Sequence, residues 1–290
     1  MNLSIESYSL REKVGDKKGI EMIANAGFDA IDYSFYFQTK DVYAPGQDYI
    51  KHAYEIRECI EKNGIVCNQA HAPFEFKYGM EMSLDEEKYR NIAHAIEAAA
   101  IMGAKNIVVH CVQTPNRHDL LDYNYRFYKS FEPICQKHSI NIAIENLFTY
   151  NSTTKRIGEL LSKPEEISEL IDRLGNENFV ACLDIGHTAL TGIEPQDFIR
   201  EIDINKLKAL HVQDNNYESD SHTVPYHGML DWDKITLALG EVGYSGDLTF
   251  EIIKFIKKYD NELLSEALRH AERTGRHLIN KIKAASKAKN

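Results

Sequence analysis

Short β-branched or apolar runs alternate with longer segments of helical periodicity from one end of the chain to the other. This alternation is typical of repeated βα units around a parallel sheet. Eight runs have the length and composition of buried strands, namely Leu3–Ser7, Ala30–Ser34, Ile65–His71, Asn106–His110, Asn141–Glu145, Phe179–Asp184, Leu207–Val212 and Asp247–Glu251. Eight parallel strands are the number that closes a (β/α)8 barrel.

Amphipathic segments separate these runs and predict helices at residues 15–26, 47–63, 84–102, 119–138, 164–174, 195–202, 232–242 and 260–285. Ser83 stands where a helix N-cap is expected, while Gly64 and Gly103 stand where a left-handed residue would end a helix. We expect the last residues of the Lys/Ala-rich C-terminus, about five, to fray.

An open, doubly wound sheet is the alternative arrangement of eight strands. The GxGxxG fingerprint of dinucleotide-binding sheets does not follow the first run, and the polar residues lie at the ends of many strands instead of at one crevice. A chain of 290 residues with 43% hydrophobic residues can fill one large core. We therefore predict an α/β protein with a single (β/α)8 TIM barrel domain over residues 1–290.

The composition argues against two classes of partner. A net charge of −10 and a pI near 5.7 disfavour a nucleic acid bound through its phosphates. No run approaches the roughly 20 apolar residues that span a bilayer, and the N-terminus lacks a basic region followed by an apolar stretch. The five cysteines form no CxxC pair, which fits a reducing compartment. We expect a cytoplasmic protein without a membrane partner.

Polar residues recur at the C-terminal ends of six predicted strands. They are His71, His110, Glu145, Asp184, His211 and Glu251. In a barrel these strand ends converge at the mouth, which is where this fold builds active sites.

Carboxylates gathered without Lys or Arg repel one another unless a cation neutralises them. Glu145, Asp184 and Glu251, together with the imidazole of His211, form a mainly hard ligand set. Such a set favours one divalent ion per chain, with Mn²⁺ or Mg²⁺ preferred and Co²⁺ or Zn²⁺ tolerated.

A second group of polar residues follows the same strands. His187 comes three residues after Asp184, and Asp220 and His222 lie in the segment after His211. Side chains two residues apart on an extended segment point the same way. Surface loops contain many such histidines, so a second metal at His187, Asp220 and His222 is the less favoured of the two interpretations.

Five motifs resemble the xylose isomerase-like TIM barrel superfamily, in particular its sugar phosphate isomerase/epimerase group, which includes the ketose 3-epimerases. They are IAIEN at 142–146, DIGHTALTG at 184–192, HVQDN at 211–215, HGMLDW at 227–232 and TFEI at 249–252. The resemblance covers nearly the whole chain and is specific for the superfamily, not for the substrate.

The resemblance implies that Glu145, Asp184, His211 and Glu251 hold the metal, and that Glu145 and Glu251 are also the catalytic acid and base. It implies that His187 contacts substrate oxygen, and we expect His71 and His110 to bind substrate beside it. The expected reaction is isomerisation or epimerisation of a sugar or sugar phosphate, by proton transfer next to a ketose carbonyl through a metal-stabilised enediolate. The PGxG turn of the family is replaced by Pro225-Tyr226-His227-Gly228.

Two other functions remain open. The endonuclease IV family of the same superfamily cleaves abasic DNA with three zinc ions, and its ligand pattern also resembles His71, His110, Glu145, Asp184, His187, His211, Asp220, His222 and Glu251. The acidic charge, the missing DRHE signature and Glu75 after His71 argue against it. A barrel that binds a metabolite without turnover is the third possibility. The fold class favours a homodimer or homotetramer.

Overall fold

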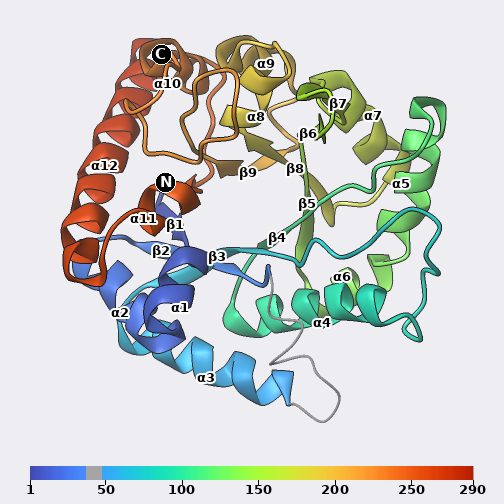
Figure 1. Ribbon diagram of the computed structural model, residues 1–290, viewed down its shortest axis with the longest axis horizontal. Coiled ribbons are helices and arrows are strands. Elements are labelled where there is room, and N and C mark those ends of the chain that lie inside the picture. Colours follow the sequence, from blue (N-terminus) through green and yellow to red (C-terminus); the bar gives the residue numbers. More distant parts are fainter. Residues whose placement is uncertain (37–47, 290) are drawn as a thin grey trace.

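The computed structural model describes residues 1–36 and 48–289, which form one barrel of parallel strands inside a ring of helices (Figure 1). The barrel strands are β1 (Leu3–Glu6), β2 (Ala30–Ser34), β3 (Val66–His71), β4 (Asn106–Val109), β5 (Asn141–Glu145), β8 (Phe179–Asp184), β9 (Leu207–His211) and β10 (Leu248–Phe250). Each of the eight predicted strands is present, and its ends agree with the prediction to within one residue.

The strands follow one another around the barrel in the order β10-β1-β2-β3-β4-β5-β8-β9. A parallel bridge between Val212 and Phe250 joins the two ends of this sheet. The Val212 amide donates to the Thr249 carbonyl at 2.8 Å, and the Glu251 amide donates to the Val212 carbonyl at 3.1 Å. These bonds close the ring, so the barrel prediction is confirmed and the open sheet is excluded.

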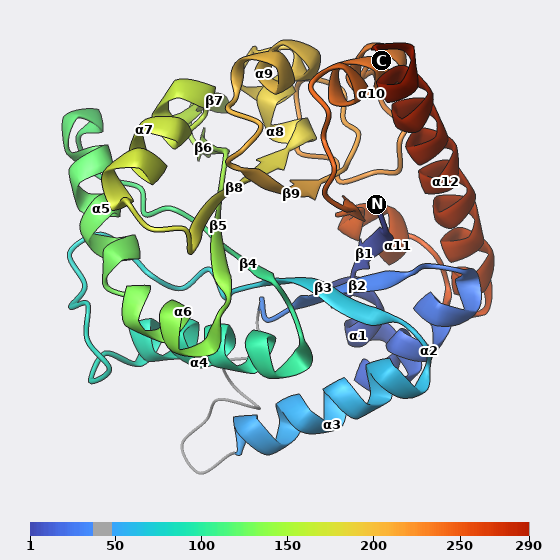
Figure 2. The same ribbon diagram turned by 180° about the vertical axis from the view of Figure 1, so that it is seen from behind.

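The helices pack around the outside of the strands, as the view from behind also shows (Figure 2). Most of them lie in or overlap the predicted segments: α2 (Asp16–Ala26), α3 (Tyr49–Lys62), α4 (Glu87–Met102), α5 (Leu120–Lys129), α6 (Glu132–His138), α7 (Pro164–Leu174), α9 (Pro195–Glu201), α10 (Trp232–Glu241) and α12 (Leu264–Lys289). The predicted start of the second helix, at residue 47, lies outside the described residues. The helix α12 continues to Lys289, into the tail that was expected to fray.

Some boundaries differ from the prediction. The single helix expected over 119–138 is two helices, because Pro133 has no N–H to donate to the carbonyl of Lys129, the last residue of α5. Ser83 is not an N-cap, since α4 begins after Glu86. Gly103 does end α4, with a left-handed φ of 97°.

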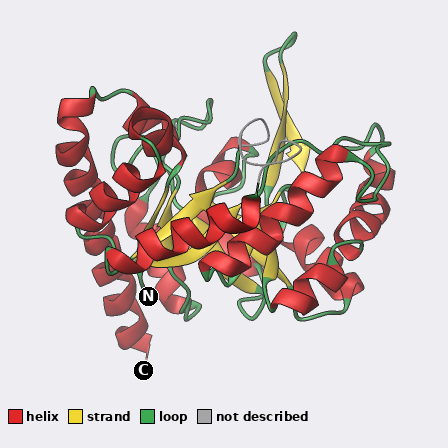
Figure 3. Cartoon of the chain, turned by 90° about the horizontal axis from the view of Figure 1, so that it is seen from below, coloured by secondary structure: helices red, strands yellow, loops and turns green. Residues whose placement is uncertain are grey.

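Five short elements at the barrel mouth were not expected. The strands β6 (Leu147–Asn151) and β7 (Arg156–Leu160) pair into an antiparallel hairpin that projects from the barrel (Figure 3). The short helices α1 (Tyr8–Val14), α8 (Ile185–Leu190) and α11 (Ile253–Lys257) each follow a barrel strand.

Alternate residues of each strand face either the helices or the barrel axis. The outward residues, such as Ile142 and Ile144 of β5, join the large apolar core beneath the helices. The inward residues of β4, β5, β8 and β9 form a second, small cluster, made of Val108, Ala143, Val180, Cys182 and Ala209. The next inward position on each of these strands, two residues further along, carries a polar residue that lies at the mouth of the barrel.

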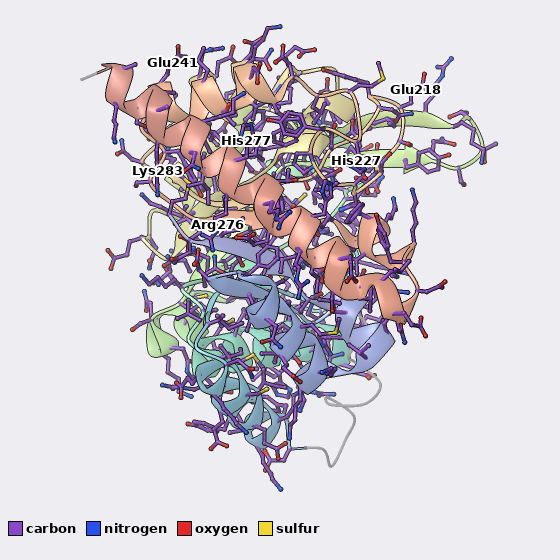
Figure 4. The ribbon with its side chains drawn as sticks, turned by 90° about the vertical axis from the view of Figure 1, so that its left-hand side faces the viewer. Glu218, His227, Glu241, Arg276, His277 and Lys283 are labelled. Carbon is purple, nitrogen blue, oxygen red and sulfur yellow. The ribbon has the colours of Figure 1, made fainter. Side chains whose placement is uncertain are left out.

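The helix α12 crosses one side of the barrel, with Arg276, His277 and Lys283 along it and His227 beside it (Figure 4). Arg276 Nη1 lies 2.6 Å from Asp29 Oδ2, just before β2. This ion pair ties the last helix to the first βα unit. None of the helices in residues 1–36 and 48–289 is both long and apolar enough to cross a membrane.

Candidate metal centre and active site

Four buried side chains meet at the C-terminal ends of consecutive strands. Glu145 ends β5, Asp184 ends β8, His211 ends β9 and Glu251 follows β10. Each offers one ligand atom, and these atoms all lie within 4.8 Å of one another. All four residues are at most 4% exposed. The structure thus brings together the four residues expected to hold a metal.

We call these four residues the tetrad. Two of its carboxylates, Glu145 and Glu251, lie close to the imidazole of His211. Its Nδ1 lies 2.6 Å from Glu145 Oε1 and 3.6 Å from Glu251 Oε2. The other Glu251 oxygen accepts a hydrogen bond from the hydroxyl of Tyr36. In the described residues no Lys or Arg lies within ion-pair distance of the three carboxylates of the tetrad.

The electrostatics of the tetrad show a shortage of positive charge. Burial, together with the nearby charges of Glu251 and Glu145, raises the pKa of Asp184 to about 7. Burial alone would raise the pKa of Glu145, but the imidazoles of His211 and His110 hold it well below its usual range. Burial alone would lower the pKa of His211, yet the negative groups around it raise it well above its usual range.

The donor set fits a divalent cation. Asp184 Oδ2 is buried and has no hydrogen-bond partner in the described part of the chain, although buried carboxylate oxygens are normally paired. Three carboxylates and one imidazole are oxygen-rich ligands of the kind that hard or borderline divalent ions take. A doubly charged ion at this position would supply the missing positive charge.

Two of the predicted substrate-binding histidines, His71 at the end of β3 and His110 just after β4, lie against the tetrad. His110 Nε2 is 2.7 Å from Glu145 Oε2, and His71 Nε2 is 3.1 Å from His110 Nε2. The ring of Phe74 covers both imidazoles, with centroid separations of 4.9 and 4.5 Å. His110 and Phe74 also line a cavity of about 530 Å³ that opens above Glu145 and Glu251.

The predicted second metal group is also assembled, at the other side of the same cavity. His222 Nε2 lies 2.7 Å from Asp220 Oδ2, and His187 Nε2 lies 3.7 Å from Asp220 Oδ1. Unlike the tetrad, this group has cationic partners. Lys254 Nζ is 3.7 Å from Asp220 Oδ2, and the pKa of His222 is raised to about 10, since Glu251 and Asp220 outweigh the effect of burial.

The sequence motifs explain how these side chains are held. Asp184 is the N-cap of α8, and its Oδ1 accepts a hydrogen bond from the His187 amide at 2.8 Å. Gln213 donates to Asp220 Oδ1 at 2.9 Å and lies so close to Gly186 that a Cβ there would be 2.4 Å from its amide carbon. The glycine in DIGH therefore makes room for the glutamine in HVQD.

Sequence reasoning missed several polar residues at the centre. Asp32 of β2 is fully buried and lies 3.2 Å from His211 Nε2, while Gln69 of β3 donates to Asp32 at 2.7 Å. Tyr36 contacts Glu251, and Glu6 is buried with its pKa raised to about 8, mainly by burial. The sequence did contain a signal for Asp32, because a carboxylate at an inward position of a buried strand needs a polar partner.

The chain matches one protein family and resembles several known proteins in sequence. The Xylose isomerase-like TIM barrel family matches residues 20–274. An uncharacterized protein y4fM of Sinorhizobium fredii is 30% identical over 168 residues, 55% of this chain and 51% of the relative. The inosose isomerase of Halalkalibacterium halodurans is 25% identical over 154 residues, 51% of each chain. The chain thus spans about half the length of these two relatives.

Two solved structures share the fold over nearly their whole length. A D-tagatose 3-epimerase-like protein has a TM-score of 0.75 at 21% identity, covering 98% of this chain and 99% of the other. An IOLI protein with a bound zinc atom has a TM-score of 0.75 at 17% identity, covering 97% of this chain and 99% of the other. Because the family match extends over most of the chain and the barrel is complete, this protein belongs to the xylose isomerase-like TIM barrel family.

Proposed function

We propose that the protein is a divalent-metal-dependent isomerase or epimerase of a sugar or sugar phosphate. The observation that carries the proposal is the tetrad itself, in which three buried carboxylates and one imidazole meet without any Lys or Arg partner among the described residues. The names of a structural neighbour, a D-tagatose 3-epimerase-like protein, and of a relative, an inosose isomerase, support carbohydrate substrates.

Glu145, Asp184, His211 and Glu251 would hold the ion. When bound, a divalent ion polarises a carbonyl and offsets the negative charge that develops on its oxygen after proton removal. Mn²⁺ or Mg²⁺ suits the three carboxylates best, and the zinc in the IOLI structure shows that a protein of this fold also binds a softer ion.

Two carboxylates of the tetrad also line the cavity, which places them within reach of a bound sugar. Glu145 comes from β5 and Glu251 from the end of β10, with β8 and β9 between them. Neighbouring imidazoles lower the pKa of both groups, so each is a carboxylate at neutral pH and able to accept a proton. One carboxylate would remove the proton beside the carbonyl and release it to solvent, while the other would take up a proton from solvent and return it to the opposite face.

The remaining cavity groups position the substrate. His187 and His110 line the cavity, and His71 Nε2 lies 3.1 Å from His110 Nε2. The exposed ring of Phe74 gives the sugar carbons an apolar surface.

Solvent exchange tests the acid/base roles directly. A panel of ketopentoses and ketohexoses, free and phosphorylated, is incubated in D2O with Mn²⁺-loaded protein, and deuterium next to the carbonyl is followed by NMR. Glu145→Gln and Glu251→Gln are expected to keep the fold and lose at least about 100-fold in exchange rate, whereas Glu61→Gln on the surface serves as the control. Undiminished exchange in either cavity variant removes that residue from the role. Tight sugar binding without any exchange indicates a binding protein.

The alternative function is zinc-dependent cleavage of abasic DNA, as in endonuclease IV. The observation that favours it is the presence of two further ligand groups, His71-Glu145-His211 and His187-Asp220-His222, beside the tetrad. The net charge of −10 and the cation Lys254 against Asp220 oppose it.

Metal analysis separates the two functions. Close to one ion per chain, with no cleavage of an abasic duplex, supports sugar chemistry. Three zinc ions per chain with cleavage supports repair, and it would also establish the second metal at His187, Asp220 and His222. Light scattering of the same samples tests the expected homodimer or homotetramer.

A further inference from the structure

Asp32 is a buried carboxylate that takes no part in the proposed reaction and lies directly behind the tetrad. It stands in the middle of β2, at an inward position and 0% exposed. In the described residues its sole ion-pair partner is His211, whose Nε2 is 3.2 Å from Asp32 Oδ2. A charge buried this deeply needs a specific partner, since desolvation makes an unpaired one costly.

The local strand pairing is arranged to hold this carboxylate in place. The register between β2 and β3 shifts between Ile31 and Asp32, which puts Asp32 opposite Gln69. The Gln69 side chain then donates to Asp32 Oδ2 at 2.7 Å, the same oxygen that faces His211. Irregularities of this kind often re-aim a side chain beside an active site.

The two nitrogens of His211 therefore face different groups. Nδ1 points to Glu145 and Glu251, on the tetrad side, while Nε2 points to Asp32. An imidazole binds a metal through an unprotonated nitrogen, and its other N–H normally donates to a carboxylate or a carbonyl, which fixes the tautomer.

We propose that Asp32, held by Gln69, is a positioning residue that keeps His211 in the Nε2–H tautomer, so that Nδ1 presents its lone pair to the metal. This inference rests on the proposed metal-dependent function. It assigns to Asp32 and Gln69 a part in metal affinity, and no contact with substrate.

Metal binding to the intact protein, measured without substrate, tests the inference. Competition with a chromophoric chelator gives the affinity for Mn²⁺ or Zn²⁺ in the native chain and in Asp32→Asn, which keeps the shape and removes the charge. The expected result is an affinity about 10- to 100-fold lower. Asp29→Asn is the matched control, because Asp29 precedes the same strand but pairs with Arg276 on the surface. It is expected to bind the metal like the native chain.

A second readout separates positioning from a general loss of structure. In the Zn²⁺-loaded, ¹⁵N-histidine-labelled protein, one buried imidazole is expected to show a protonated Nε2 and a metal-shifted Nδ1. In Asp32→Asn this pattern is expected to weaken or to mix with the other tautomer, at an unchanged far-ultraviolet circular dichroism spectrum. If Asp32→Asn does not fold, Gln69→Met leaves the charge and removes its second partner, and a smaller loss of affinity is expected.

The outcomes distinguish this inference from the proposed function. Native affinity in Asp32→Asn, or in a folded Gln69→Met if the first variant fails to fold, overturns the inference and leaves the function standing. Metal bound through the tetrad with the expected loss in Asp32→Asn, but no sugar turned over, supports the inference and overturns the function. A native chain that binds metal no better than Glu145→Gln overturns both.

Discussion

At the scale of single residues, the centre contains two buried carboxylates, Glu6 and Asp184, whose pKa values are raised, so their ionisation destabilises the fold when no cation is bound. Asp184 is the clearest case, because its burial and its carboxylate neighbours raise its pKa to about 7 from an ordinary value of 3.8. Its ionisation therefore costs the folded chain free energy that the unfolded chain does not spend. The same residue also caps α8, which an asparagine can do equally well.

Asp184→Asn is expected to stabilise the metal-free protein at alkaline pH. A group whose pKa is raised on folding contributes stability below its unfolded value, near pH 4, and loses that contribution as the pH rises through 7. In chelator, the variant should match the native chain near pH 4 and exceed it at pH 8, by an amount on the order of 4 kcal/mol. Urea unfolding at pH 4, 6 and 8 measures the difference.

The exposed Asp172→Asn variant controls for the loss of one charge. With saturating Mn²⁺ the native chain is expected to be more stable than Asp184→Asn, because that variant lacks one of the proposed metal ligands. If the free energy of unfolding differed between the native chain and Asp184→Asn by the same amount at every pH, the ionisation of Asp184 would not be its cause.

At the scale of elements, the repeated βα units could be predicted from the sequence, whereas the β6–β7 hairpin, which occurs once, was missed. Eight apolar runs and their amphipathic partners are recognisable because each must bury a face, so periodicity marks them. The hairpin of β6 and β7 is a local insertion after β5, and its alternation of Phe148, Tyr150 and Ile157 with polar residues was a usable signal. The six polar residues predicted at strand ends lie together at the barrel mouth, whereas Asp32 lies inside a strand and was not predicted.

The contact between α10 and α12 offers a test of packing at this scale. A Cβ on Gly240 would lie 2.4 Å from Ala285 Cβ and 2.8 Å from the Ile282 carbonyl oxygen, which belongs to the backbone of α12. Alanine gains about 1 kcal/mol of helix propensity over glycine. Overpacking of a rigid contact costs about 1–3 kcal/mol.

Gly240→Ala is therefore expected to lower the free energy of unfolding by roughly 1 kcal/mol, because the clash outweighs the gain in propensity. Thermal unfolding followed by circular dichroism measures the shift. Leu237→Ala, which changes a 45% exposed side chain of the same helix, is the control and should have a smaller effect. A higher melting temperature for Gly240→Ala would mean that α12 can move away without cost.

At the scale of the whole molecule, the tetrad spans the place where the barrel closes. Its residues come from β5, β8, β9 and the end of β10, and the joint between β9 and β10 consists of one bridge and the two hydrogen bonds of Val212 and Glu251. The other neighbouring strands share longer ladders, such as the four register pairs between β4 and β5. An ion bound to all four side chains would therefore hold together the joint with the fewest backbone bonds.

Removal of the metal is expected to loosen this joint more than the rest of the barrel. Amide hydrogen exchange, measured by NMR with Mg²⁺ and after chelation, should speed up by at least about 10-fold at Val212 and Glu251. The Ala72 amide donates to the Val108 carbonyl at 2.9 Å, between β3 and β4 on the opposite side of the barrel. It is the internal control, and its exchange rate should change less. A uniform acceleration at all three amides would instead indicate that the ion stabilises the folded state as a whole. Unchanged exchange at Val212 and Glu251 would show that the barrel closes without help from the tetrad, because a bound ion that bridges β9 and β10 must slow their separation.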